Sequence, residues 1–262
     1  MLKKRIIPLI LCKDNNVVKG KCFNNTRIVG ALLQTIKVFN MRDVDELVVL
    51  NVKNDRSTFS EEMVKEISIN SNVPLSIGGG ISTIKQVKSF FRNGVDKIVL
   101  NSVLYKKQNL LSECADLFGS QSITVSIDVK KNSSGDFICY KDCGKTKTSI
   151  LLTKWLKKVH TLGAGEIIIN SINYDGLLNG LDIELGKIVS SETDLPVILS
   201  GGAGRPEDFF FAFKSSQISG IAAGAIFQFT EYTPRNVKDF LKGKKMKKKN
   251  TIPFKLISEY SV

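Results

Sequence analysis

The chain has 262 residues, of which 42% are hydrophobic, and this length suits either one large barrel domain or two ordinary domains. No uncharged stretch approaches about 20 residues and no cleavage site follows the N-terminal run, so neither a membrane span nor a signal peptide is expected. The net charge of +13 invites a nucleic-acid partner, but much of the excess lies in residues 242–249 without a binding motif. We interpret that run as a solvated tail and expect a cytoplasmic protein with no nucleic-acid or membrane partner.

The cysteines and the histidine argue against a disulfide framework and against a metal site. The five cysteines are scattered and odd in number, which favours reduced thiols. Cys139 and Cys143 have no further Cys or His nearby, and the sole histidine is His160. We therefore expect no metal, and the glycine turns lack the context of a dinucleotide cofactor site.

Short apolar runs alternate with segments of helical spacing along the chain. The apolar runs, read as strands, cover residues 5–11, 46–52, 75–77, 97–100, 123–128, 166–172, 196–200 and 220–223. The helical segments cover residues 28–39, 61–69, 84–93, 149–162, 183–190 and 206–215. This alternation predicts an α/β protein with a parallel sheet, and eight units suit a (β/α)8 TIM barrel over residues 1–240, followed by a basic extension at 241–262. An open doubly wound sheet is the competing fold, but no G-x-G-x-x-G follows the first strand.

A glycine-rich turn occurs twice, and so does a second motif. Residues 78–81 recur as 201–204, and residues 101–103 recur as 224–226, both at an offset of 123 residues. Each motif follows an apolar run, so each copy pairs two strand ends where bare backbone N–H groups can hold an anion. The repeat predicts two matched phosphate sites and a barrel built from two similar half-barrels.

In such a barrel the chemistry lies at the C-terminal ends of the strands. Asp128 is the one carboxylate at a predicted strand end, and Asp175 follows in the loop after the sixth strand. A role for Asp128 as a helix cap is the alternative. We interpret Asp128 as a general acid or base.

Many short motifs, in order from residue 1 to about 240, resemble the cyclase subunit of imidazole glycerol phosphate synthase. They lie at residues 4–8, 13–14, 17–20, 45–47, 78–81, 119–121, 163–167, 171–172, 175–176 and 200–204. The resemblance implies a (β/α)8 barrel that takes ammonia from a glutaminase partner and adds it to a substrate with two phosphates.

The resemblance also implies which residues bind that substrate. One phosphate site would comprise Gly80, Asn101 and Ser102, and the other Gly176, Gly202, Ala223 and Gly224. Gly224 departs from the family, which usually has a serine there. Lys19 matches a family lysine near the substrate, and a plain surface lysine is the alternative; with Asp175 it forms the expected substrate loop.

The family closes its imidazole ring with two aspartates, and only one of them is present. Asp128 matches the aspartate of the fifth strand, whereas Leu11 stands where the first strand carries the other. Losing a positioned acid–base group typically costs about 10²- to 10⁴-fold in that step. Asp14 is three residues away, roughly 10 Å along an extended edge, and cannot replace it. Asn51, Asn170 and Asn173 also stand where the family usually carries Asp, Thr and Asp, so the end of the barrel that holds the site has lost acidity.

The opposite rim keeps four charges at strand starts. In the family, the positions of Arg5, Glu46, Lys97 and Glu166 form the gate through which ammonia enters, and Asp96 matches a residue of the partner interface. The alternative is a solvated rim in which surface pairs contribute little. We expect ammonia delivery to be retained.

A retained gate with a lost aspartate resembles a divergent branch linked to surface-polysaccharide (lipopolysaccharide) biosynthesis, which is thought to aminate or amidinate a sugar. We favour that branch, with a phosphorylated or nucleotide sugar as the substrate. Genuine imidazole glycerol phosphate synthesis remains the first alternative, and a non-catalytic, ammonia-channelling partner of a glutaminase the second. A related sugar-phosphate isomerase would need the missing aspartate of the first strand.

Overall fold

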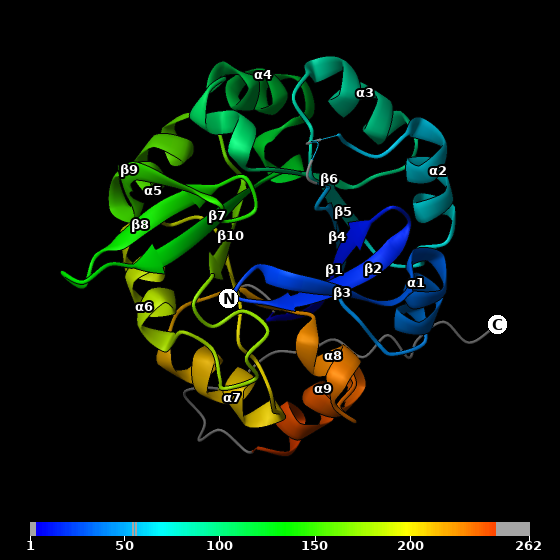
Figure 1. Ribbon diagram of the computed structural model, residues 1–262, viewed down its shortest axis with the longest axis vertical. Helices are drawn as coiled ribbons and strands as arrows, with labels where there is room; N and C mark the ends of the chain where they lie inside the picture. Colours follow the sequence, from blue (N-terminus) through cyan, green and yellow to red (C-terminus); the bar gives the residue numbers. More distant parts are fainter. Residues whose placement is uncertain (1–3, 54, 56, 245–262) are drawn as a thin grey trace.

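The computed structural model describes residues 4–53, 55 and 57–244, and these form a closed (β/α)8 barrel (Figure 1). Within them, eight parallel strands make the ring, which closes where β7 pairs with β10 and β12 pairs with β1. The ring strands are β1 Arg5–Lys13, β4 Leu47–Asn51, β5 Leu75–Gly78, β6 Lys97–Leu100, β7 Ile123–Lys131, β10 Glu166–Ser171, β11 Val197–Ser200 and β12 Gly220–Ala223. The predicted fold class is confirmed, and so are all eight predicted strands.

The helices surround the ring (Figure 1). They are α1 Leu32–Asn40, α2 Glu61–Ile69, α3 Ile84–Arg92, α4 Asn109–Phe118, α5 Leu152–Thr161, α6 Ile183–Glu192, α7 Pro206–Ser215, α8 Ala225–Phe229 and α9 Pro234–Gly243. Local capping fixes several starts: Ser60 accepts from the Met63 N–H, and Thr83 and Gln86 form a capping box. The predicted bounds of α2 and α7 agree with the structure, whereas α4, α8 and α9 match none of the predicted segments.

Two antiparallel hairpins interrupt the alternation, one in each half of the barrel. β2 Asn16–Lys21 and β3 Asn24–Ala31 follow β1, while β8 Phe137–Lys141 and β9 Thr146–Leu151 follow β7. Because β1 and β7 are the first strands of their halves, the matched insertions agree with the half-barrel repeat.

The hairpins correct two predicted helix starts. The helix predicted at residues 28–39 begins at Leu32, because residues 28–31 belong to β3, where Ile28 is 66% exposed. The helix predicted at 149–162 begins at Leu152, because residues 149–151 belong to β9. In both cases the last apolar residues of the hairpin strand happen to continue the spacing of the helix that follows. Local periodicity alone therefore could not separate the end of the strand from the start of the helix.

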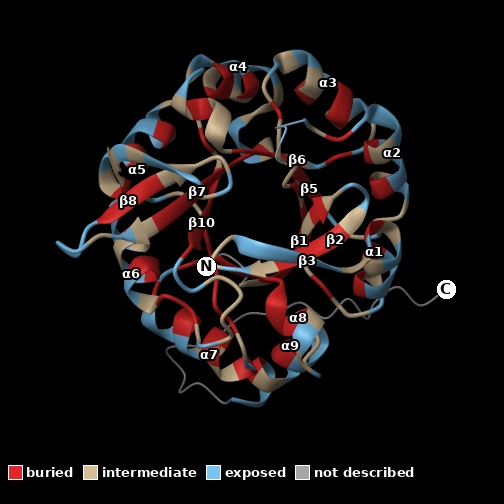
Figure 2. Cartoon of the chain, in the orientation of Figure 1, coloured by how far each residue is buried: buried red, intermediate tan, exposed pale blue. Residues whose placement is uncertain are grey.

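Alternate residues of each ring strand face opposite sides of the sheet. On β7, Ile123 and Val125 join the large core between sheet and helices, whereas Thr124, Ser126 and Asp128 face the barrel interior. A separate apolar cluster fills that interior and comprises Ile7, Leu9, Val48, Val99, Ile168, Ile198 and Ala222. Figure 2 shows the buried residues along the ring strands and on the inward sides of the helices. The barrel is therefore a packed apolar scaffold, and the few polar side chains that face its interior are candidates for function.

Helix α9 closes the described chain and crosses residue 240, where the barrel domain was expected to end. Most of the expected extension, from residue 245 onward, lies outside the described residues. In the part of the chain that the structure covers, no helix is long and apolar enough to cross a membrane.

Replacing Lys238 by Met tests how α9 is held to the barrel. The Lys238 side chain is 1% exposed, and its Nζ lies 3.1 Å from Asp45 and 3.3 Å from Asp43. Asp45 in turn accepts a hydrogen bond from the Ile6 N–H at 2.9 Å. Removing the shared cation should lower the free energy of unfolding by about 3 kcal/mol in urea denaturation. Lys242→Met, whose partner Asp239 is 62% exposed, should change it by less than about 0.5 kcal/mol.

Candidate functional site

A cavity of about 690 Å³ opens at the C-terminal ends of the strands. It brings together residues that the sequence analysis assigned separately: Leu11, Asn51, Gly80, Asn101, Ser102, Asp128, Asn170 and Asp175 all line it. Residues from β1, β4, β6, β7 and β10 thus meet at one mouth, as the barrel geometry requires.

Asp128 is the best-defined acid–base group of this cavity. It is 4% exposed, and both its oxygens accept hydrogen bonds, from Asn170 Nδ2 at 2.7 Å and from Asn101 Nδ2 at 2.9 Å. Burial raises the pKa of Asp128 to about 6, against the lowering effect of the two amides, and the nearby Asp175 adds to the rise. A carboxyl group with this pKa can both accept and give up a proton near neutral pH.

A buried layer behind Asp128 was not singled out from the sequence. Tyr105 stacks on Trp155 with ring centroids 4.5 Å apart, and burial raises the pKa of its hydroxyl, with a further contribution from Asp128. Burial also raises the pKa of Cys139 to about 12, so this thiol stays protonated. Tyr105 and Trp155 are 50 residues apart in the sequence and show no local motif that marks them.

The residues of the first expected phosphate site line the large cavity. Gly79 and Gly80 have φ values of 93° and 71°, a conformation that glycine adopts without strain. The Ser102 hydroxyl accepts a hydrogen bond from the Asp142 N–H at 2.8 Å, and Asn101 links this region to Asp128. The backbone turn and the acid–base group are therefore neighbours.

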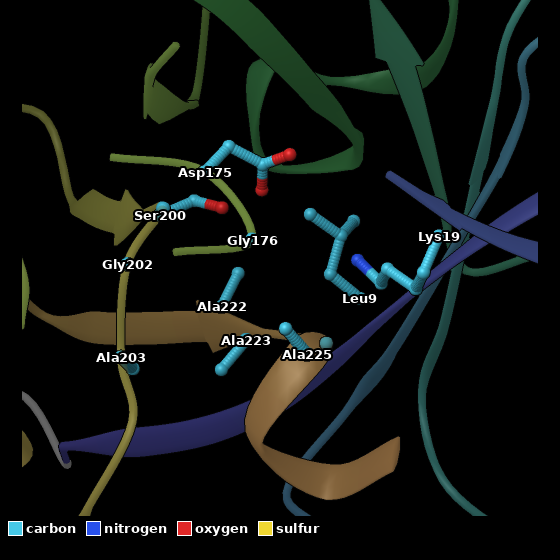
Figure 3. A pocket seen from close by; sticks show the side chains of 12 residues that line it. Leu9, Lys19, Asp175, Gly176, Ser200, Gly202, Ala203, Ala222, Ala223 and Ala225 are labelled. Carbon is cyan, nitrogen blue, oxygen red and sulfur yellow. The ribbon is translucent and has the colours of Figure 1, made fainter. Parts of the chain in front are cut away.

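The residues of the second expected phosphate site line a different cavity of about 10 Å³. Figure 3 shows Gly176, Gly202 and Ala223 around it, with Lys19 and Asp175 reaching inward. Gly224 lines it too, and Leu9 and Asp175 line both cavities. The cavities that hold the two expected phosphate sites therefore share part of their wall, at Leu9 and Asp175.

Leu11 makes the wall of the mouth at β1 apolar. It pairs in register with Leu50 of β4, and both side chains pack on the apolar interior cluster. Asp14 lies outside the set that lines the cavity; its side chain is 64% exposed and pairs with Lys53 at 2.9 Å. Asp14 therefore does not take the place of the missing carboxylate.

The large cavity is rich in lysine. Three aspartates line it, Asp128, Asp142 and Asp175, against six lysines: Lys13, Lys53, Lys106, Lys107, Lys141 and Lys145. The Asn51 amide donates a hydrogen bond to the carbonyl of nearby Ser57 at 3.1 Å. Asn173 is exposed. Such a mouth favours an anionic ligand.

At the opposite end of the barrel, four side chains close a ring of ion pairs. Arg5 binds Glu46 at 2.8 Å and also Glu166, while Lys97 binds Glu46 at 3.2 Å and Glu166 at 2.9 Å. Ser76 adds a hydrogen bond to Glu46 at 2.7 Å. Two positive and two negative charges balance, with side-chain exposures of 18% and 21% for the cations and 4% and 6% for the carboxylates. The solvated rim considered from the sequence is not what these four residues form.

The pKa values in the ring reflect this pairing. Burial acts to raise the pKa of Glu166, but Arg5 and Lys97 outweigh it and lower that pKa. Burial likewise acts to lower the pKa of Arg5, and Glu166 and Glu46 raise it overall. Asp96 lies beside Lys97 on this face; it is exposed, and its carboxylate accepts from the Leu75 N–H at 2.8 Å.

Among residues 4–53, 55 and 57–244, no three His, Cys, Asp or Glu side chains group as metal ligands would. The polar groups of the mouth are amides, hydroxyls, lysines and isolated carboxylates. They can orient an anion and transfer protons.

The protonation of Asp128 can be tested by carboxyl ¹³C NMR. We expect a midpoint near pH 6, so that about nine-tenths of the group is ionised at pH 7. Asn101→Ala or Asn170→Ala removes a hydrogen bond that favours the carboxylate, so each should raise the midpoint. Asn173→Ala, at an exposed position, should leave it unchanged. A midpoint near 4 in the unmodified protein would contradict this interpretation.

Comparison with known proteins agrees with this geometry. Residues 5–233 match the family described as Histidine biosynthesis protein. Proteins named imidazole glycerol phosphate synthase subunit HisF are 38% identical to the chain: that of Natranaerobius thermophilus over 247 residues, covering 93% of this chain and 98% of the relative, and that of Chlorobaculum parvum with the same coverage. The subunit of Chlorobaculum tepidum is 38% identical over 245 residues, 92% of this chain and 97% of the relative. None of these names points to surface-polysaccharide synthesis. The chain therefore belongs to the histidine biosynthesis protein family, with the HisF-like cyclase subunits as its relatives.

Proposed function

We propose that the chain is the ammonia-using synthase subunit of a glutamine amidotransferase complex, which acts with a glutaminase subunit on a substrate that carries two phosphates. The closed ring of Arg5, Glu46, Lys97 and Glu166 is the observation that carries this proposal. A buried, neutral ring of paired charges at the floor of the barrel costs desolvation energy, which a purely structural role would avoid with apolar residues.

A polar wall leads from this ring to Asp128. In the register of β7 with β10, Thr124 pairs with Glu166 of the ring, and Asp128 pairs with Asn170 at the mouth. Ser126 lies between them on the same face and accepts a hydrogen bond from Asn170 at 3.0 Å. The Thr124 hydroxyl is buried, and within the described residues it has no hydrogen-bond partner. Such a wall offers hydrogen bonds to ammonia moving through the interior.

The chemistry then needs three contributions from the chain. The two glycine-rich sites hold the phosphates and so orient the substrate, which replaces a bimolecular encounter by a positioned one. Ammonia arrives from the floor, away from bulk water, as the nucleophile. Asp128, with its pKa near 6, accepts or returns the proton.

For the substrate, the names of the relatives favour the imidazole glycerol phosphate reaction. Chains that are 38% identical over nearly their whole length carry that name. We therefore take the histidine-pathway bisphosphate as the first candidate, with Asp128 as the single acid–base group.

Amination or amidination of a phosphate-bearing or nucleotide sugar is the second candidate, and Leu11 is the observation that favours it. Leu11 and Leu50 form an apolar wall where ring closure would call for a second carboxylate. A reaction that adds ammonia without closing a ring has less need of that group. The lysine-rich mouth suits either anionic substrate.

Comparing the protein with its Leu11→Asp variant tests the substrate. With the histidine-pathway bisphosphate and ammonium salts, the native chain should be slow, and the variant should gain about 10²- to 10⁴-fold. The matched control, Leu11→Asn, supplies a polar side chain that cannot act as a general acid or base, so its turnover should rise little. Native turnover at the rate of a relative that has the aspartate would remove the second candidate. If neither protein turns the bisphosphate over although both still bind phosphate, the first candidate, the histidine-pathway reaction, would be removed.

Lys97→Met tests the gate. It breaks two of the four ion pairs while keeping the length of the side chain. In the complex with the glutaminase, the ratio of glutamine-driven to ammonium-driven turnover should fall about tenfold, equivalent to about 1.4 kcal/mol. Lys88→Met, on an exposed face of α3, is the matched control and should keep the ratio. An unchanged ratio in Lys97→Met would refute ammonia passage through the ring.

A further inference from the structure

Three lysines without an ion pair line the large cavity, and we call them the outer lysines. Lys106 and Lys107 follow the short 3₁₀ helix η1 Ser102–Tyr105, and Lys141 ends β8. Within the described residues, their ammonium groups have no ion pair and no hydrogen bond. Lys106 and Lys107 are exposed, and Lys141 is half-buried. Like charges gathered at one cavity repel one another, and a bound anion offsets that repulsion.

The outer lysines lie beside the first expected phosphate site, of which Ser102 is part. The N–H groups of Lys106 and Lys107 both donate to the Val103 carbonyl, at 3.0 and 2.8 Å, and this fixes the turn that follows Ser102. From the hairpin, the Asp142 N–H donates to the Ser102 hydroxyl at 2.8 Å, next to Lys141. Two elements far apart in the sequence therefore bring cations to the surroundings of the same hydroxyl.

The Ser102 hydroxyl still has a proton to donate. It accepts the hydrogen bond from Asp142, and among the described residues it donates to no group. A hydroxyl that accepts on one side can donate to a phosphoryl oxygen on the other. A phosphate held by this hydroxyl and the Gly80 turn would therefore have the outer lysines beside it.

The carboxylates of the cavity do not answer these charges. Asp128 accepts from two amides, at 2.7 and 2.9 Å, and the Asp142 carboxylate accepts from the Thr146 hydroxyl at 3.1 Å. Lys53, another lysine of the cavity, pairs with Asp14 at 2.9 Å. The first phosphate can be met by backbone N–H groups alone, so the outer lysines keep a positive charge for a further group. The cavity of about 690 Å³ has room for one.

From this arrangement we infer that Lys106, Lys107 and Lys141 form a subsite for a second phosphoryl group, bonded to the phosphate at Gly80 and Ser102, so that this end of the cavity takes a diphosphate ester. The inference rests on the proposed function only for placing the first phosphate at Gly80. It deepens that function by naming the substrate class. A nucleotide sugar carries such a diphosphate, so the subsite favours that form of the second candidate.

Inorganic phosphate and inorganic pyrophosphate, titrated separately into the full-length protein and followed by amide NMR, test the subsite. At the Gly80 amide, pyrophosphate should reach half-saturation at a concentration about tenfold lower than phosphate, because only pyrophosphate reaches the outer lysines. Lys141→Met should remove most of this preference, and so should the double variant Lys106→Met with Lys107→Met. Both should keep half-saturation by phosphate within about twofold of the native value.

Lys147→Met is the matched control. It removes the same charge from the same hairpin, but Lys147 is exposed on β9 and is not among the residues that line the cavity. The preference for pyrophosphate should persist in this variant. Equal half-saturation of the native chain by the two anions would overturn the inference. An equal loss of preference in Lys147→Met and Lys141→Met would also overturn it, because net charge alone would then explain the binding.

Methyl diphosphate distinguishes a diphosphate ester from free pyrophosphate. The ester has one ionisable oxygen fewer, so its half-saturation at Gly80 should lie within about threefold of that of pyrophosphate. A chain that binds pyrophosphate but not methyl diphosphate would overturn the assignment of an ester. These readouts involve no ammonia chemistry: a clear preference for diphosphate in a chain without ammonia-dependent turnover would refute the proposed function alone.

Discussion

In a closed parallel sheet, each strand residue faces either the interior or the helices, and the described strands of this barrel obey that constraint throughout. Apolar residues on both sides pack the scaffold, so the polar residues that face inward stand out; within the described residues, Ser126 and Asp128 have hydrogen-bond partners and the Thr124 hydroxyl has none. On β7 this places Thr124, Ser126 and Asp128 in one line from floor to mouth. The position of the candidate site follows from that alternation and from the direction of the strands.

Charge is treated differently at the two ends of the barrel. At the floor, Arg5 and Lys97 each meet both Glu46 and Glu166, and the ring is neutral. At the mouth, Asp128 receives hydrogen bonds from two amides, and within the described residues it has no ion pair. Burial without charge compensation tunes a carboxyl group for proton transfer, whereas full compensation favours a fixed structure. The mouth therefore suits proton transfer, and the floor suits a fixed structure.

The chain matches its relatives over almost its whole length, and two positions that depart from the family resemblance, Leu11 and Gly224, line the two cavities. Leu11 packs on the apolar interior cluster and lines the large cavity. Gly224 gives its space to Lys19, because a Cβ atom on residue 224 would overlap Nζ of that lysine.

The sequence by itself determined the eight strands, most of the helices, the glycine turns and Asp128, because periodicity and turn chemistry act over a few neighbouring residues. The family resemblance pointed to the four charges of the floor. Only the tertiary structure decided that these charges close a ring, that Asn101 and Asn170 share Asp128, and that Lys19 occupies the space beside Gly224. Each of those contacts joins residues far apart in the chain, and closing the barrel brings them together. The hairpins were missed because their short strands resemble extensions of the neighbouring helices in local pattern.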